Sequence, residues 1–149
     1  MVHRIALFIH LSAAIIWIGG MVFAYFCLRP AAAECLDPPQ RLPLWVASFR
    51  RFFRLVAVAV VVLLASGFTL LPLSGLAVLP HGWLAMMGLG LVMALVFAYL
   101  YAVRYPRLVV LVGQSRWPEA AAVLDGIRRL VAVNLVLSLL VVAAAVSAR

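Results

Sequence analysis

The chain has 149 residues, of which 68% are hydrophobic and 11% are charged, and its mean hydropathy is +1.22. Ordinary soluble domains contain about 45–50% apolar and about 25% charged residues, so this composition excludes a soluble enzyme, a disordered segment and a disulfide-rich secreted scaffold. The net charge is +8, all of its basic side chains are arginines, and they lie between apolar stretches. Membrane topology explains arginines in such positions, and we therefore expect no nucleic-acid partner.

Four apolar stretches are long enough to cross a bilayer, whose hydrocarbon core of about 30 Å requires about 20 helical residues. They are residues 5–28, 55–72, 82–103 and 128–148. Helices are the expected form because lipid cannot hydrogen-bond an exposed backbone. The first stretch is longer than the apolar core of a signal peptide, about 7–15 residues, which favours a retained span. The sequence thus predicts one all-α domain over residues 1–149, an integral membrane four-helix bundle.

The segments that connect the spans carry their own helix signals. Asp37 followed by two prolines is typical of a helix N-terminus. The next residues, 38–54, mix aromatic side chains with arginines, and we expect them to form a helix in the headgroup region that continues into the second span. Trp117, followed by proline and glutamate, predicts a helix start that extends the fourth span toward the cytoplasm.

The distribution of arginine predicts the orientation. Residues 29–54 and 104–129 hold five arginines each, residues 72–81 hold none, and only Arg4 and Arg149 remain near the ends. Cytoplasmic segments of membrane proteins carry the excess of positive charge. We therefore expect both arginine-rich segments in the cytoplasm and both termini outside. Abundant Ala, Val, Leu and Arg without lysine suggests a GC-rich bacterial genome, which makes the inner membrane the expected location, with the termini periplasmic.

His10 is the clearest candidate for a functional group. It lies about 9 Å inside the first span at a rise of 1.5 Å per residue, and an ionisable side chain within a span is costly and usually functional. Neutral imidazole binds copper and haem iron. Two interpretations remain open from the residues alone, a metal or haem ligand and a histidine that hydrogen-bonds a neighbouring helix.

His81 and Met86 are the candidate partners of His10. His81 opens the third span on the same outer side, but the two histidines differ in depth by about 9 Å. A haem ligated by both histidines would therefore require a shifted or extended third helix. Met86 matches the depth of His10 better, Met87 is adjacent, and His3 lies on the same side. Imidazole with thioether suits Cu(I) and also haem, so copper ion and haem b both remain possible cofactors.

The third span also carries small residues at intervals of four, including Gly90 and Ala94. Such a stripe lets helices approach closely in lipid. Of the remaining polar groups, Asn134 and Ser138 share one face of the fourth span and are expected to hydrogen-bond between helices. None of the predicted spans contains Asp, Glu or Lys, and the few arginines stand at span ends. This argues against a proton-coupled transporter that relays protons through carboxylates.

Several motifs together resemble small membrane proteins of the CopD (copper-resistance D-like) type. They are His10-Leu-Ser-Ala-Ala-Ile-Ile-Trp17-Ile-Gly-Gly20, Leu28-Arg-Pro30, Pro39-Gln-Arg-Leu-Pro-Leu-Trp45, Arg51-Phe-Phe53, Ser66-Gly67, Met87-Gly-Leu-Gly90, Tyr105-Pro-Arg-Leu108 and Ile127-Arg-Arg-Leu-Val-Ala-Val-Asn134. The resemblance covers most of the chain. It implies a four-helix bundle of the bacterial inner membrane that takes part in copper handling. Larger members have more spans, so the chain corresponds to only part of them.

A more distant similarity is to HemJ-type protoporphyrinogen oxidases, which also have four spans and an early histidine. Those enzymes use a lysine that this chain lacks, so the resemblance implies haem binding more than that activity. We accordingly expect binding or transfer of copper rather than enzymatic turnover. The alternatives are a haem-dependent redox protein and a non-catalytic accessory subunit. The first would be a single chain or a homo-oligomer, and the last would belong to a larger membrane complex.

Overall fold

The computed structural model describes residues 1–73 and 81–147, without the side chains of residues 71–73, and this part of the chain is helical apart from short turns. The prediction of an all-α fold is confirmed for these residues. The arginine-free loop predicted at 72–81 falls mostly outside them, as does Arg149. The helices are α1 (Val2–Val22), the π-helix η1 (Phe23–Leu28), α2 (Arg29–Cys35), α3 (Pro38–Leu73), α4 (His81–Tyr99), the π-helix η2 (Leu100–Arg104), α5 (Tyr105–Gly113) and α6 (Trp117–Ser147).

Both predicted helix starts are confirmed. The carbonyl of Asp37 accepts the N–H of Arg41 at 2.8 Å, so α3 begins directly after Asp37. The carbonyl of Arg116 accepts the N–H of Ala120 at 2.9 Å at the start of α6. In each case a proline occupies the first turn, where its missing N–H costs nothing.

The two π-helices have a common cause that sequence reasoning did not foresee. Pro30 and Pro106 each follow one residue after a π segment. A proline cannot donate to the carbonyl four residues earlier and its ring clashes with it, so the preceding turn widens. Accordingly the N–H of Arg29 bonds to the carbonyl of Ala24, and that of Tyr105 to Leu100, both five residues back. The helix thus continues past each proline instead of ending there.

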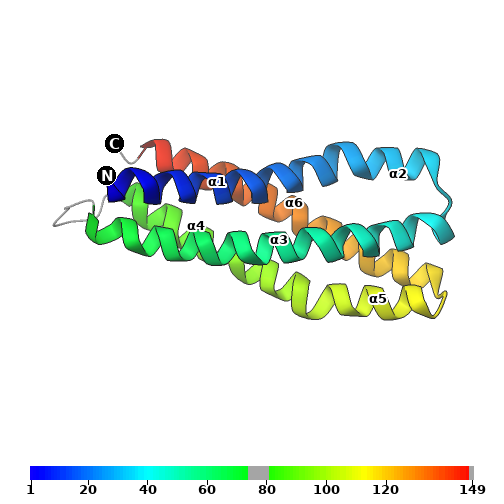
Figure 1. Cartoon of the computed structure of the whole chain (residues 1–149). Helices are drawn as coiled ribbons and strands as arrows, with labels where there is room; N and C mark the ends of the chain where they lie inside the picture. The colour runs from blue at the N-terminus through cyan, green and yellow to red at the C-terminus, as the bar shows by residue number, and fades with distance from the viewer. Residues whose placement is uncertain (74–80, 148–149) are drawn as a thin grey trace.

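The elements form two long helical hairpins. The first consists of α1, η1 and α2 with α3, and the second of α4, η2 and α5 with α6 (Figure 1). α1 packs mainly against α3 and α4 mainly against α6, while α3 joins the hairpins through α5 and α6. The start of α1 and the end of α6 lie at the same end of the bundle, opposite the α2–α3 and α5–α6 turns (Figure 1).

Four helical stretches are long and apolar enough to cross a membrane, namely Val2–Cys35, Pro38–Leu70, His81–Gly113 and Trp117–Ser147. The prediction of four membrane helices is therefore confirmed. The first and third helices run further than the predicted spans, because η1 and η2 carry them past the arginines. Residues 38–54 are continuous with the second span in α3. Their position in the headgroup region, and the side of the membrane that each end faces, remain predictions.

The tightest packing is in the half of the bundle near the turns. Phe53 lies at its centre and is 2% exposed. Its ring centroid is 4.9 Å from that of Phe49, 5.8 Å from that of Phe97 and 5.5 Å from that of Tyr105. The cluster extends from Leu42 to Trp17, and toward the termini few side chains are buried. One half of the molecule is thus a dense core, and the other half is open.

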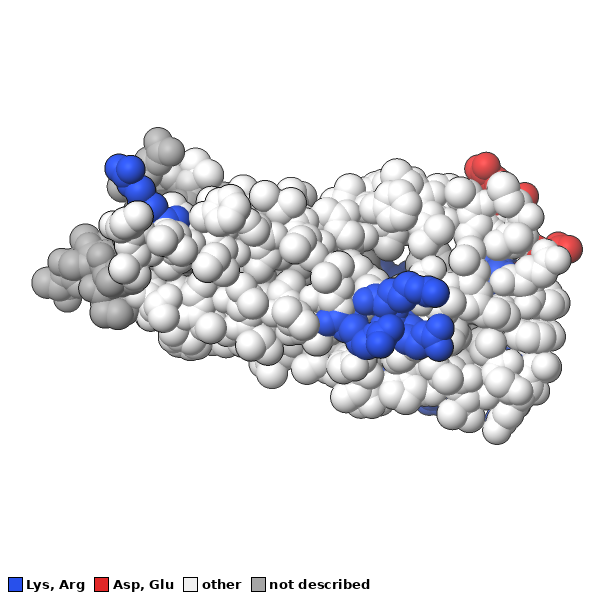
Figure 2. Space-filling model, viewed as in Figure 1, with Lys and Arg blue, Asp and Glu red and all other residues white. Residues whose placement is uncertain are grey.

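Charged side chains follow the same division. Arginines cluster partway along the face shown in Figure 2, whereas acidic side chains gather at the end with the turns. Arg50, Arg51 and Arg54 of α3 are all exposed. A belt of arginine between an apolar half and an acidic tip is the arrangement expected at a cytoplasmic membrane surface.

Candidate metal site in a cavity between the hairpins

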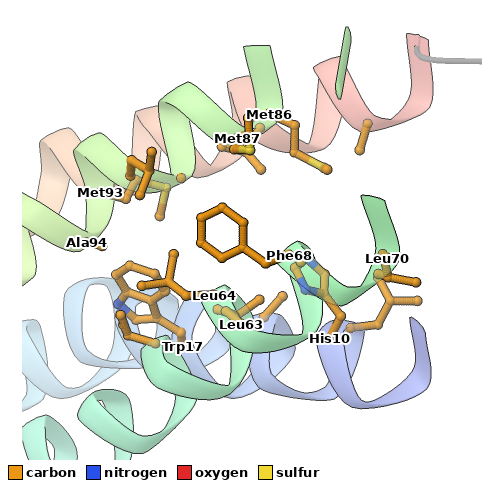
Figure 3. A pocket seen from close by; sticks show the side chains of 18 of the residues that line it. His10, Trp17, Leu63, Leu64, Phe68, Leu70, Met86, Met87, Met93 and Ala94 are labelled. Carbon is orange, nitrogen blue, oxygen red and sulfur yellow. The ribbon is translucent and has the colours of Figure 1, made fainter. Parts of the chain in front are cut away.

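A cavity of about 370 Å³ opens between the two hairpins, in the half of the molecule near the termini. It begins where the dense core ends, with Trp17 and Met93 among its walls. All four long helices contribute to it, and its lining is mostly apolar (Figure 3). The lining residues are His3, Leu7, His10, Leu11, Ala14, Trp17 and Ile18 of α1, Val60, Leu63, Leu64, Gly67, Phe68 and Leu70 of α3, Trp83, Met86, Met87, Gly90, Leu91, Met93 and Ala94 of α4, and Ser138, Val141 and Ala145 of α6.

His10 is held in the cavity wall by Ser66. Its Nδ1 lies 2.9 Å from the Ser66 hydroxyl oxygen, and that hydroxyl lies 2.6 Å from the carbonyl oxygen of Val62. A serine hydroxyl has a single proton to donate. Because the Val62 carbonyl can only accept that proton, Nδ1 must be the donor to Ser66. The imidazole is therefore in the Nδ1–H form, and its Nε2 carries the free lone pair.

Gly67 lets the imidazole approach the backbone of α3. A Cβ at position 67 would lie 3.4 Å from Cε1 and 3.8 Å from Nδ1 of His10. A larger side chain would have to occupy the space of the ring. Ser66 and Gly67 thus form one seat for His10, with the hydroxyl fixing the ring's rotation and the glycine providing room.

Thioether sulfurs face His10 across the cavity. Met86 and Met87 of α4 line the wall opposite His10 of α1, and the ring of Phe68 from α3 points into the space between them (Figure 3). Phe68 is 53% exposed although it points inward, which shows how open the cavity is. The structure therefore brings His10 and Met86 onto the same cavity, together with Met87 and His3.

His81 is not brought to this cavity. It is the first residue of α4, it is exposed, and it is not among the described residues that line the cavity. Within the same described residues, no group of three or more His, Cys, Asp and Glu side chains could hold a metal ion. A metal site here must consequently depend on thioether sulfur as well as imidazole.

The small-residue stripe of α4 has a different role from the one expected. Gly90 and Ala94 line the cavity, and a Cβ added at Gly90 would meet nothing within 4 Å. The stripe was expected to bring helices into close contact, and for Gly90 this was wrong. Helix packing in this region depends instead on Asn134, 1% exposed, whose amide donates to the carbonyl of Met93 at 3.3 Å. That bond between α6 and α4 confirms the interhelical role predicted for Asn134, whereas Ser138 donates within its own helix to Leu135 at 2.7 Å.

Comparison with known protein families gives one match. The family described as copper resistance protein D, CopD, matches residues 46–148, which is more than half of the chain. The chain belongs to the CopD family. It is a multi-pass membrane protein of that family, and the family description implies copper resistance or handling. The comparisons with curated proteins and with solved structures give no match.

The CopD match divides the cavity residues. Ser66, Gly67, Met86 and Met87 lie within the matched residues, whereas His10 precedes them. The role of His10 therefore depends on its geometry in the cavity. Sequence reasoning had singled out His10 and Met86 and had noted Ser66 only as a polar residue within a span. A serine in a membrane helix directly before a glycine was the available signal for the seat of the imidazole.

Proposed function

We propose that this CopD-family protein binds Cu(I) in the cavity between its hairpins, with His10 and Met86 as the principal ligands. Met87 and His3 line the same cavity and are further candidate ligands. The observation that carries the proposal is the hydrogen bond from His10 Nδ1 to Ser66. It leaves Nε2 as the coordinating atom, and metal-binding histidines are commonly held by such a second hydrogen bond.

The donor set favours copper in its reduced state. Thioether and imidazole are soft and borderline ligands, which suit Cu(I). Harder divalent ions prefer carboxylate oxygen, and none of the described residues that line the cavity is acidic. The apolar surroundings also favour an ion of low charge over a divalent ion, because desolvation cost rises steeply with charge.

The protein would hold or pass on copper rather than catalyse a reaction. The cavity ends at the dense aromatic core, where Trp17 packs edge-on against Phe97 with ring centroids 6.1 Å apart. Copper entering from the end with the termini would therefore stay in that half of the bundle. In the predicted orientation this is the periplasmic side of a bacterial inner membrane.

Haem b is the alternative ligand, because His10 with Met86 is also a known axial pair. His81 remains a sequence-based candidate for that role. A haem carries two acidic propionate groups, which would need basic partners. The described lining contains two histidines and no arginine, which supports copper over haem.

The test is a Cu(I) titration of the detergent-purified protein against a chromophoric Cu(I) chelator under anaerobic conditions. We expect binding by the unaltered protein, loss of that binding in His10→Ala, and weaker binding in Met86→Leu. Met21→Leu is the matched control, because Met21 is 2% exposed and packs in the core outside the cavity.

An absorption spectrum of the same preparation distinguishes the alternatives. A colourless protein with copper bound through His10 supports the proposal. A Soret band with a sharp reduced α-band would replace copper by haem. Full copper occupancy in His10→Ala would contradict the assignment of the site. Co-purification with other chains, without copper or haem, would favour the accessory-subunit hypothesis.

A further inference from the structure

A second polar site lies at the other end of the predicted spans, where η1, α3 and α6 meet. A small cavity of about 20 Å³ is lined there by Tyr25 and Arg29, by Trp45 and Phe49, and by Ile127 and Arg128. Arg29 follows the first predicted span and Arg128 opens the fourth. The site is therefore at the level where lipid headgroups are expected.

Each guanidinium at this site is stacked on an aromatic ring. The Cζ atom of Arg29 lies 5.1 Å from the ring centroid of Tyr25, and that of Arg128 lies 5.5 Å from the ring centroid of Trp45. A ring face satisfies the flat side of a guanidinium but not its N–H edge. Stacking thus fixes two cationic groups in place and leaves hydrogen-bond donors available.

The positive charge at the site exceeds the negative charge close to it. Arg128 is 3.5 Å from Asp125, but the same carboxylate is also 4.0 Å from Arg129 and is 56% exposed. Arg29 and Arg41 are close enough to repel Arg128 electrostatically. One shared and solvated carboxylate does not balance these arginines, so an anion would be attracted here.

Two buried donors also lack an acceptor. Trp45 is 2% exposed, and its indole Nε1 has no hydrogen-bond partner among the described residues. The Nε atom of Arg128 is buried and unpartnered in the same way. An unpaired buried donor costs about 1–3 kcal/mol. The adjoining cavity has room for a single oxygen atom, and an acceptor placed there would satisfy these donors.

We infer that this site binds the phosphate group of an anionic ligand between Arg29 and Arg128, with Trp45 as a further donor. Arginine with its planar set of donors is well suited to phosphate. The bulk of the phosphate lies at the mouth of the cavity, and one oxygen enters it. An anionic phospholipid and free inorganic phosphate share this chemistry. This inference is independent of the copper site.

The test measures lipid binding by the full-length protein, using native mass spectrometry from a neutral detergent. Phosphatidylglycerol is titrated against phosphatidylcholine, and inorganic phosphate is titrated separately. We expect phosphatidylglycerol to bind, and each of Arg29→Gln and Arg128→Gln to weaken that binding by about tenfold or more. Arg50→Gln is the charge-matched control, because Arg50 is exposed on α3 and is not among the residues that line this cavity.

Trp45→Phe keeps the ring and removes only the N–H group, so it tests the site even if an arginine variant folds poorly. It should weaken binding less than the arginine variants but more than Arg50→Gln. Binding of inorganic phosphate at the same residues would identify the free anion as the source, and binding of phosphatidylglycerol alone would identify the lipid. Equal binding by all four variants, or equal binding of phosphatidylcholine, would overturn the inference.

Discussion

The hydrogen bond between His10 and Ser66 leads to a quantitative prediction for Ser66→Ala. The substitution removes the acceptor of Nδ1–H, which the structure places at 2.9 Å, and does not touch the coordinating Nε2. The imidazole then loses its fixed rotation and its single proton position. Loss of such a supporting bond costs about 10–100-fold in metal affinity, or about 1.4–2.7 kcal/mol. We therefore expect Ser66→Ala to keep Cu(I) binding but to weaken it by that factor.

The assay is the anaerobic competition titration described above, read as an apparent Kd for Cu(I). Ser147→Ala is the matched control, because Ser147 also donates to the carbonyl four residues earlier, at 2.8 Å, but is exposed and outside the cavity. Ser66→Thr keeps a hydroxyl and should recover most of the affinity. If folded Ser66→Ala binds Cu(I) as tightly as the unaltered protein, the assignment of Nε2 as the coordinating atom is wrong.

Three further changes test the site, the core and the orientation. Gly67→Leu should weaken Cu(I) binding in the same titration, because a Cβ there already lies 3.4 Å from the imidazole, whereas Gly88→Leu should not, because it meets open space. Phe53→Ala should lower the thermal unfolding temperature in detergent by removing about 3–5 kcal/mol of packing, and Phe68→Ala, at a 53% exposed position, should lower it far less. Cys35 is exposed, and with the other cysteine replaced by alanine it should react with an impermeant maleimide only after the cells are permeabilised; ready labelling of intact cells would reverse the predicted orientation.

The number and order of the helices could be predicted because the bilayer imposes a length on every apolar stretch. The start of α3 at Pro38 and that of α6 at Trp117 also followed from local rules, since capping and proline preferences act within one turn. The π-helices could not be predicted in the same way. Proline next to an arginine reads equally well as a helix end, and only packing of the following turn shows that the helix continues.

The candidate site was only half visible in the sequence. His10 was notable because an imidazole inside a span is costly, and Met86 was found by comparing depths along the helices. Ser66 could not be paired with His10, since the two residues are far apart in the chain and the facing registers of α1 and α3 are set by tertiary packing. The same limit explains the error at Gly90, because a small residue reads alike whether it faces a helix or a cavity.

The division of the bundle into a dense half and an open half gives stability and binding to different residues. Aromatic packing around Phe53 joins the two hairpins near the turns. The hairpins are therefore held together without needing close contact near the termini. An ion could enter between them there with little change in the core. It follows that substitutions of cavity residues such as Met86 should change affinity more than stability, whereas substitutions in the core should do the reverse. A single ranking of variants by both properties would contradict this division.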